Sequence, residues 1–388
     1  MVKLLMLITS LAGGGAERVA SELSLHLDSG IDRRIVTLVD TVSYPSNKPP
    51  ISINYNFFEP KWLSMLFAVP ICAYKYRKLI EANNPDISMS FLTLDNIINV
   101  ISNVGNKNTR VILQVHIALS MKFSQNPFHK IIKKMIQCIY NRADTIIAVS
   151  EGVKEELIEC YGIQSEKVVV IHNPNNIEKI QLQAQESVDH PWFSGEIPII
   201  FNMGRLTKQK GQWHLIRAFA KVREQQECKL VIRGDGELKE DLQSLVTLLG
   251  LSEDVLFLPW VENPYKYISK ATVFVFSSLW EALPYALIEA MACGCPVIAT
   301  DCKYGPREII GENEYGILVS CLSGDYCASG PLDVYEYELA NKIISLLNDD
   351  PQIKLLSLKA KERASHFDLA SSTMKYKILF HGTASTDN

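Results

Sequence analysis

Short apolar runs rich in β-branched residues alternate with longer amphipathic stretches along the whole chain. This alternation is typical of βαβ units, in which crossover helices join parallel strands. Each half of the chain holds enough apolar runs to form its own doubly wound sheet, so we predict an α/β fold. The predicted strands are 3–8, 34–39, 86–90, 110–116, 145–149 and 168–171, then 197–203, 229–232, 255–258, 272–276, 296–299 and 316–319.

The boundary between the two halves is predicted from a change in composition. Residues 173–198 contain Asn-Pro-Asn-Asn, a Gln-rich polar stretch and His-Pro-Trp, which are typical of a connection. We therefore expect a first domain over 1–175, a linker over 176–196 and a second domain over 197–366. The last helical pattern has no strand after it, and we expect residues 367–380 to pack back on the first domain. A length of 388 residues fits two domains of ordinary size.

Composition excludes several protein classes. An apolar content of 47% excludes disorder. No run approaches the roughly 18 apolar residues of a spanning helix, since the most apolar segment, Trp62–Ile80, is interrupted by Pro70 and basic residues. The apolar start, Leu4–Ile8, is too short for a signal peptide and reads as a buried first strand. We therefore expect a cytoplasmic protein.

The nine cysteines are scattered, as expected for buried thiols in a reducing compartment. Cys293, Cys295 and Cys302 lack the spacing of a zinc site and have no neighbouring His, so we predict no metal site.

Charge is distributed unevenly along the chain. Through Asn175 there are 18 Lys and Arg against 15 Asp and Glu, and the remainder has 21 against 28. No acidic residue occurs between Asp95 and Asp144, a stretch that includes Lys130, Lys133 and Lys134. A basic cluster beside apolar side chains suits docking on an anionic membrane, and it equally suits a solvated helix face. A pI near 6.1 gives no indication of a nucleic-acid partner.

Two glycine-containing junctions indicate anion binding. The first strand leads into Gly13-Gly-Gly15-Ala-Glu-Arg18, where backbone N–H groups at a helix start can approach an anion. A tight turn without a ligand is the alternative. In the second half, Gly204-Arg205-Leu-Thr-Lys-Gln-Lys210-Gly follows a strand, and its cations suit a diphosphate; a solvated turn is the alternative.

A third motif contains two glutamates with seven residues between them. Glu281 lies in the turn after a Val/Phe strand, and Glu289 lies on an otherwise apolar helix. Glu is rarely buried without a partner. A carboxylate there could accept hydrogen bonds from both hydroxyls of a ribose, or it could form an ion pair with a Lys or Arg.

Together these motifs resemble the retaining family 4 glycosyltransferases of the GT-B fold. The two glutamates and the following Ala-Met-Ala-Cys-Gly-Cys-Pro296 resemble that family's signature, and the segment 204–211 resembles its diphosphate clamp. The Gly13–Arg18 loop, the segment after Val149 and the segment after Asp301 also match, in the family's order.

The resemblance implies two Rossmann-like domains facing a central cleft. It further implies retention, no metal and no cofactor, with the nucleotide sugar as a substrate. The residues implied in catalysis are Arg205, Lys210, His116 and Glu281, and those implied in donor binding are Gly15, Gly204, Leu283, Pro284, Tyr285 and Glu289. Glu289 would hold the ribose, whereas Arg205, Lys210 and the N–H of Gly15 would stabilise the diphosphate.

Two departures from the family pattern concern the donor side. Ala282 stands where the family usually has Gly, so its Cβ atom narrows backbone access to the sugar, and the loop over 320–331 is longer than usual. The stretch from Cys302 to Glu308 resembles members that use UDP-hexoses or UDP-N-acetylhexosamines, so it favours UDP.

The resulting hypothesis is a glycosyltransferase of surface-glycan or lipid-linked oligosaccharide assembly. Its acceptor would be a saccharide or a lipid-linked saccharide, reached by peripheral contact of Lys130, Lys133 and Lys134 with an anionic membrane. The alternatives are a GT-B sugar-nucleotide epimerase and a non-catalytic sugar-nucleotide-binding subunit.

Overall fold

The computed structural model describes residues 1–58, 61–123, 127–322 and 324–382. It divides into two compact units. The first unit contains Met1–Pro174 together with the chain from Leu369, and the second unit contains Asn175–Asp368.

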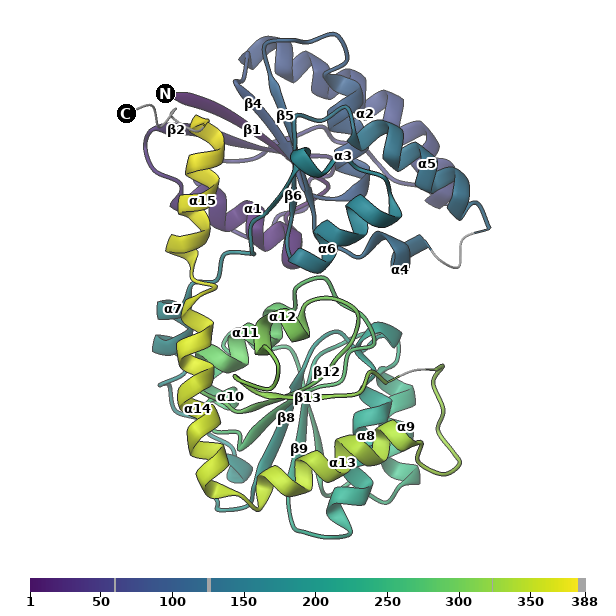
Figure 1. The fold of residues 1–388 in the computed structure, drawn as a ribbon, viewed down its shortest axis with the longest axis vertical. Coiled ribbons are helices and arrows are strands. Elements are labelled where there is room, and N and C mark those ends of the chain that lie inside the picture. The colour runs from purple at the N-terminus through teal and green to yellow at the C-terminus, as the bar shows by residue number, and fades with distance from the viewer. Residues whose placement is uncertain (59–60, 124–126, 323, 383–388) are drawn as a thin grey trace. The chain divides into compact units, whose positions relative to one another are not determined.

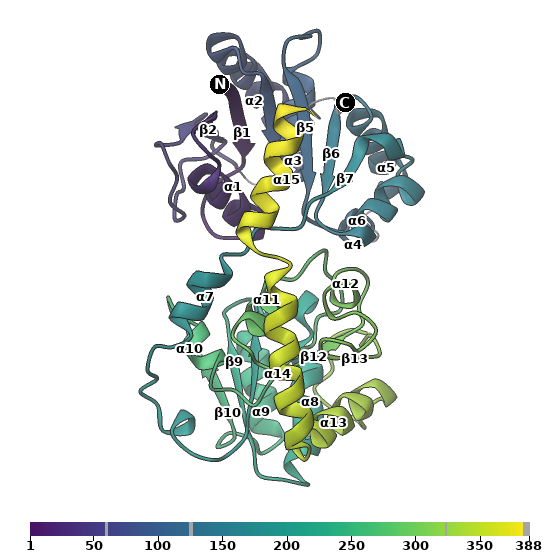
Figure 2. The same ribbon diagram turned by 60° about the vertical axis from the view of Figure 1, so that its left-hand side comes forward.

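The first unit is a seven-stranded parallel sheet with helices on both faces. Its strand order is β3-β2-β1-β4-β5-β6-β7. Figures 1 and 2 show α1 and α15 on one face and α2, α3 and α5 on the other. The strands are β1 (Val2–Ile8), β2 (Ile31–Thr37), β3 (Ile51–Ser52), β4 (Ile87–Ser90), β5 (Arg110–Val115), β6 (Thr145–Ala148) and β7 (Val168–Val170). The helices are α1 (Gly15–His26), α2 (Lys61–Asn83), α3 (Thr93–Ser102), α4 (Leu119–Phe123), α5 (His129–Tyr140), α6 (Glu151–Glu155) and α15 (Leu369–His381).

The second unit repeats this plan with six parallel strands in the order β10-β9-β8-β11-β12-β13. In Figures 1 and 2 the helices α8, α9 and α13 cover one face of its sheet, and α10, α11 and α14 cover the other. The strands are β8 (Ile199–Met203), β9 (Lys229–Arg233), β10 (Val255–Leu258), β11 (Val273–Phe276), β12 (Val297–Thr300) and β13 (Ile317–Val319). The helices are α7 (Ile177–Gln183), α8 (Gln212–Arg223), α9 (Lys239–Leu248), α10 (Tyr265–Ile268), α11 (Tyr285–Ala292), α12 (Pro306–Ile310), α13 (Val334–Leu347) and α14 (Asp350–Ser365).

All twelve predicted strands are present. Most of them are buried apolar runs of the kind that fills the middle of a parallel sheet. The two-residue strand β3 was not predicted. It pairs with β2 at the edge of the first sheet. Two residues are too few to show the hydrophobic pattern of a strand.

The predicted linker differs from the structure. Residues 177–183 form α7, which packs against α10 and α11 within the second unit. Its buried residues are Ile177 and Ile180, three positions apart on one helix face, and the surrounding Gln-rich composition hides this short stripe. The ring of Phe193 also packs against Tyr267, at 5.2 Å between ring centroids. Most of the polar segment is therefore part of the second unit.

The C-terminal helix α15 belongs to the first unit, where the sequence led us to expect it. Its last turn is fixed by Arg110 of β5, whose guanidinium donates to the carbonyls of Leu379 and Phe380 at 3.1 and 3.3 Å. Lys377 pairs with Asp28 at 2.9 Å, and Tyr376 is fully buried.

Candidate active site

Each sheet changes the direction of its strand order at one point, and the predicted motifs lie there. The change falls between β1 and β4 in the first unit and between β8 and β11 in the second. Ligands of open α/β sheets bind outside the carboxyl ends of the strands at such switch points. The loops that follow β8 and β11 carry the segments 204–211 and 277–284.

Three hydrogen bonds join these two loops of the second unit. The hydroxyl of Ser277 donates to the carbonyl of Lys210 at 2.9 Å. The backbone N–H of Leu279 donates to the carbonyl of Gln209 at 2.8 Å, and the side-chain amide of Gln209 donates to the carbonyl of Trp280 at 2.9 Å. The two motifs, about 70 positions apart in sequence, therefore form one surface.

Gly211 makes this close approach possible. It has a φ of 58°, in the left-handed region, and a Cβ atom at this position would lie 2.4 Å from the carbonyl oxygen of Ser277. A side chain there would both strain the backbone and separate the loops.

Lys210 and Glu281 form an ion pair across this joint. The ammonium of Lys210 contacts Glu281 Oε1, and it also lies 5.6 Å from the centroid of the Phe276 ring. The side chains are 17% and 9% exposed, so both charges are largely withdrawn from water. A cation held beside a carboxylate at a strand end can bind a phosphate and leave the carboxylate to accept hydroxyl hydrogen bonds.

Arg205 and Gly204 complete this loop. The Arg205 side chain is exposed, while its carbonyl accepts a hydrogen bond from the buried Gln212 side chain at 3.1 Å. The N–H of Gly204 donates to the carbonyl of Arg233 at 3.1 Å. The backbone of this loop is thus fixed while the guanidinium faces outward.

The donor-helix residues surround the start of α11. Leu283 and Pro284 are buried, and Tyr285 is half-buried in the first turn. Glu289, four positions further on, is 5% exposed and accepts a hydrogen bond from the Tyr265 hydroxyl at 2.8 Å. Ala282, the departure from the family pattern, is also buried. The carboxylate that we predicted for a ribose is therefore positioned by a tyrosine from α10.

Gly15 begins α1 in the first unit, after the extended residue Gly14. The loop before it is held by buried Asp95, whose carboxylate accepts from the Thr9 N–H at 3.0 Å and the Thr9 hydroxyl at 2.7 Å. Burial raises the pKa of Asp95 to about 7. The N-cap residue, Gly14, has no side chain to cap the start of α1. As at other helix N-termini, the backbone N–H groups there can bind an anion.

His116 directly follows β5. Its ring centroid lies 6.1 Å from that of Phe91. The buried Nε2 has no hydrogen-bond partner among the described residues, and burial lowers the pKa of His116 to about 3. The imidazole is therefore neutral at physiological pH, and a buried nitrogen of this kind is suited to a ligand hydroxyl.

The predicted acceptor lysines lie on α5. Lys130, Lys133 and Lys134 are exposed, and the same helix exposes Ile131 and Met135 by 68% and 41%. The side chain of Trp62, which begins the apolar segment 62–80, lies outside the described part of the structure. The exposed face of α5 is therefore both basic and apolar.

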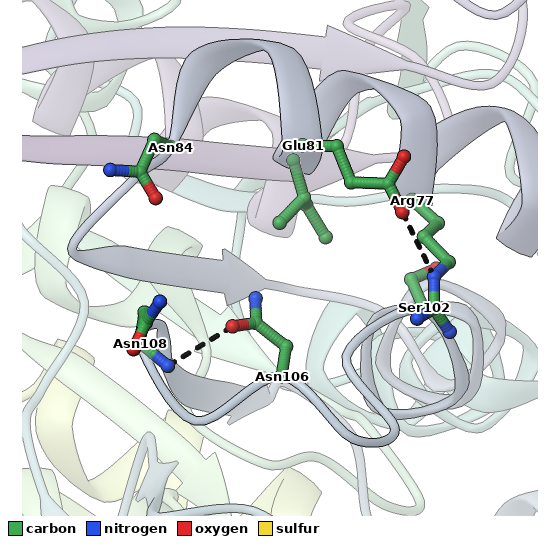
Figure 3. A pocket seen from close by; sticks show the side chains of 7 residues that line it. Arg77, Glu81, Asn84, Ser102, Asn106 and Asn108 are labelled. Carbon is green, nitrogen blue, oxygen red and sulfur yellow. Dashed lines mark hydrogen bonds and ion pairs between the residues drawn. The ribbon is translucent and has the colours of Figure 1, made fainter.

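A pocket of about 230 Å³ lies elsewhere in the first unit. It is shown in Figure 3 and is lined by Arg77, Ile80, Glu81, Asn84, Ser102, Asn106 and Asn108. Some of its polar groups bond one another, with Arg77 Nε donating to Glu81 at 3.2 Å and the Asn108 N–H to Asn106 at 3.0 Å. It borders the turns before β4 and β5, at the amino ends of the strands. We therefore do not assign it to the active site.

One group of potential metal ligands occurs among the described residues, namely His214, Asp333 and Glu336. Glu336 accepts hydrogen bonds from Arg217 Nε and pairs with His214 Nδ1, both at 2.8 Å. The guanidinium of Arg217 already supplies the positive charge beside Glu336. We therefore interpret this cluster as one that stabilises the fold.

Three residues that shape the site were not predicted from the sequence, namely Gln209, Tyr265 and Asp95. Gln209 lies within the clamp segment and Tyr265 follows Asn263-Pro264, but neither residue type signals its partner. Asp95 was noted only as the edge of the acid-free stretch. All three act through contacts with residues distant in sequence.

Comparison with known proteins gives consistent matches over nearly the whole chain. Residues 13–179 match the model described as Glycosyltransferase Family 4, and residues 185–330 match that described as Glycosyl transferases group 1. The chain is 32% identical over 385 residues, covering 97% of this chain and 100% of the relative, to the N-acetylgalactosamine-N,N'-diacetylbacillosaminyl-diphospho-undecaprenol 4-alpha-N-acetylgalactosaminyltransferase of Campylobacter jejuni. It is 28% identical to the lipopolysaccharide 1,6-galactosyltransferase of Salmonella typhimurium, over 70% of this chain and 69% of the relative.

Solved structures support the same fold. HepE of Anabaena, crystallised with UDP, has a TM-score of 0.77 at 19% identity and covers 98% of this chain and 100% of its own. Sucrose-phosphate synthase of Thermosynechococcus elongatus has a TM-score of 0.79 at 18% identity, with 98% of each chain covered. The two parallel-sheet units are those of the GT-B fold.

Proposed function

Since this chain belongs to the family 4 glycosyltransferases, we propose that it transfers a hexose or N-acetylhexosamine from a UDP-sugar to a saccharide or lipid-linked saccharide, with retention and without a metal. The observation that carries this proposal is the joint between the β8 and β11 loops. There a largely buried Lys210–Glu281 pair lies at a switch point of the second sheet.

In this proposal each site residue has a distinct role. Lys210 and Arg205 stabilise the diphosphate as negative charge develops on the leaving group, and Glu289 accepts hydrogen bonds from the ribose hydroxyls. Glu281 binds hydroxyls of the donor sugar, together with the backbone N–H groups of Leu283 and Tyr285. The neutral His116 accepts or donates one hydrogen bond to a sugar hydroxyl.

The transfer step needs no protein nucleophile in this proposal. The acceptor oxygen bonds to the anomeric carbon as the bond to the UDP oxygen breaks, and the acceptor proton passes to the departing phosphate. Lys210 stabilises the phosphate charge during this exchange, which is the electrostatic contribution that usually dominates such reactions.

The relatives support the choice of donor and acceptor. The Campylobacter enzyme is named for transfer of N-acetylgalactosamine to a saccharide on diphospho-undecaprenol, and HepE was crystallised with UDP. A lipid-linked acceptor requires the enzyme to work at a membrane surface. No described helix is both long enough and apolar enough to span a membrane. We propose peripheral contact through α5, because the exposed face of that helix is both basic and apolar.

Release of free UDP tests the proposed function. We expect release from UDP-N-acetylgalactosamine, UDP-galactose or UDP-glucose only when an undecaprenyl-diphosphate-linked saccharide is present, with the sugar recovered in the lipid product. UDP binding without transfer or hydrolysis under any acceptor would favour the non-catalytic binding subunit. Conversion of one UDP-sugar into its epimer without an acceptor would favour the epimerase.

Reversing the charge of the α5 lysines tests membrane contact. Lys130→Glu, Lys133→Glu and Lys134→Glu together should weaken binding to phosphatidylglycerol vesicles at low salt by more than about 100-fold, because each lysine contributes about 1 kcal/mol near an anionic surface and each new glutamate is repelled by it. A sedimentation assay measures this. The matched control reverses three exposed lysines elsewhere, Lys342, Lys354 and Lys375, and should bind like the native protein. Equal binding by both triple variants would contradict docking through α5.

A further inference from the structure

The segment after β5 carries His116 and then forms the short helix α4 (Leu119–Phe123). His116 has a buried Nε2 without a hydrogen-bond partner among the described residues. Its side chain packs against Phe91, but that ring contact alone does not fix the nitrogen. The position and orientation of the imidazole therefore depend on the backbone of residues 116–120.

This backbone is held by a carboxylate from another part of the first unit. Glu156 accepts from the Leu119 N–H at 2.7 Å and from the Ser120 N–H at 3.2 Å. The Ser120 hydroxyl also contacts Glu156 Oε1. Three donors at the start of α4 thus converge on one side chain, and both carboxylate oxygens are used.

Glu156 is buried to 1% exposure, and it forms no ion pair with a Lys, Arg or His of the described residues. A buried carboxylate is costly unless hydrogen bonds compensate for lost water, so the contacts to α4 are the reason it can remain inside. The neighbouring Glu151, Glu155 and Glu159 are all exposed. Glu156 is thus the member of this acidic helix that faces inward.

The local helix geometry at Glu156 is also unusual. The α-helical turns of α6 (Glu151–Glu155) pass into a π-helical turn over Glu156–Cys160. Such turns are rare and occur often at functional sites. The start of α6 is fixed by Ser150, whose hydroxyl accepts from the Val153 N–H at 3.3 Å. The Glu156 carboxylate therefore projects from the point where the α-helical turns give way to the π-helical turn.

We propose that Glu156 is a positioning residue for His116. By holding the first turn of α4 it fixes the backbone that follows β5, and so it sets the direction of the imidazole toward the sugar. Glu156 does not touch substrate in this role. The inference rests on the proposed function, in which His116 bonds a sugar hydroxyl.

The test compares Glu156→Gln with its exposed neighbour Glu155→Gln. Glutamine keeps the size of the side chain, but its amide nitrogen cannot accept a second hydrogen bond. We expect kcat for transfer from a UDP-sugar to fall about tenfold in Glu156→Gln, because hydrogen bonds to a charged group are lost. Glu155→Gln should transfer at the native rate. An equal rate in native protein and Glu156→Gln would overturn the proposal.

A double-mutant cycle with His116→Ala separates positioning from general support of the fold. If Glu156 acts through His116, adding Glu156→Gln to His116→Ala should lower kcat by less than twofold. If the two losses simply multiply, Glu156 acts independently of His116 and the proposal is overturned. Should Glu156→Gln fail to fold, Ser120→Ala removes one donor from the same cluster, and its smaller loss of kcat should vanish in the His116→Ala background in the same way.

A readout that needs no activity separates this inference from the proposed function. In protein labelled with ¹⁵N-histidine, the His116 resonances should shift in Glu156→Gln and not in Glu155→Gln. If the native protein transfers no sugar, the proposed function fails, and the His116 resonances still test the contact. Unchanged resonances in Glu156→Gln would overturn the positioning role even in an active enzyme.

Discussion

Replacing Lys210 with methionine should lower the rate of sugar transfer by about 10²–10³-fold. That is the usual loss when one preorganised group is removed from a developing negative charge, and Lys210 is held at the β8–β11 joint by its contact with Glu281. Methionine preserves most of the apolar stem, so the change removes charge more than volume. Initial rates of UDP release at saturating acceptor measure the effect.

Loss of stability has to be separated from loss of catalysis in this experiment. Removing one partner of a largely buried ion pair costs up to about 3–5 kcal/mol, so Lys210→Met alone should also unfold at a lower temperature. The double variant Lys210→Met/Glu281→Gln removes both charges and should regain much of that stability without regaining activity. Lys221→Met, which breaks a helix-surface pair with Glu224, should leave both properties unchanged. A double variant with native transfer rates would show that Lys210 has only a structural role.

Replacing Glu289 with glutamine should weaken UDP binding by about 10–100-fold. The side chain is 5% exposed and is oriented by the Tyr265 hydroxyl at 2.8 Å, and glutamine cannot accept two ribose hydroxyls with both of its terminal atoms. Each hydrogen bond lost from a charged group is worth about 1.5–3 kcal/mol. Isothermal titration with UDP measures the affinity, and the rise in unfolding temperature with added UDP provides a second reading.

Two further variants sharpen the assignment of Glu289. Tyr265→Phe keeps the carboxylate but removes the donor that orients it, so it should weaken UDP binding by a smaller factor. Glu253→Gln changes an exposed carboxylate at the amino end of β10 and should bind UDP like the native protein. Native UDP affinity in Glu289→Gln would refute the ribose assignment.

Much of the fold was predictable because parallel strands buried on both faces are continuous apolar runs. The clamp segment and Glu281 follow such runs, so their positions at strand ends were predictable too. The pairing of Lys210 with Glu281 was not predictable, since it depends on β8 and β11 being neighbours in the sheet. Neither the strand propensity of a segment nor its hydrophobic periodicity shows which strands are neighbours.

Two other features, the helix α7 and the inward direction of Glu156, could not be predicted from their local sequence. The stripe of Ile177 and Ile180 is too short to stand out from its polar surroundings, so α7 was read as linker. The inward direction of Glu156 follows from its contacts with Leu119 and Ser120, whereas its sequence context is a run of similar acidic residues. In both cases the deciding partners are distant in sequence.

The return of α15 to the first unit has a consequence for the order of folding. The first unit contains residues up to Pro174 and again from Leu369, so almost two hundred residues are synthesised between its two parts. On the ribosome, where N-terminal domains generally fold first, this unit must wait with part of one sheet face uncovered beside α1 until α15 has been synthesised. The second unit is continuous in sequence and can fold before release. Contacts between Arg110 and the last turn of α15 therefore close the structure last, and their large sequence separation should make that step slow.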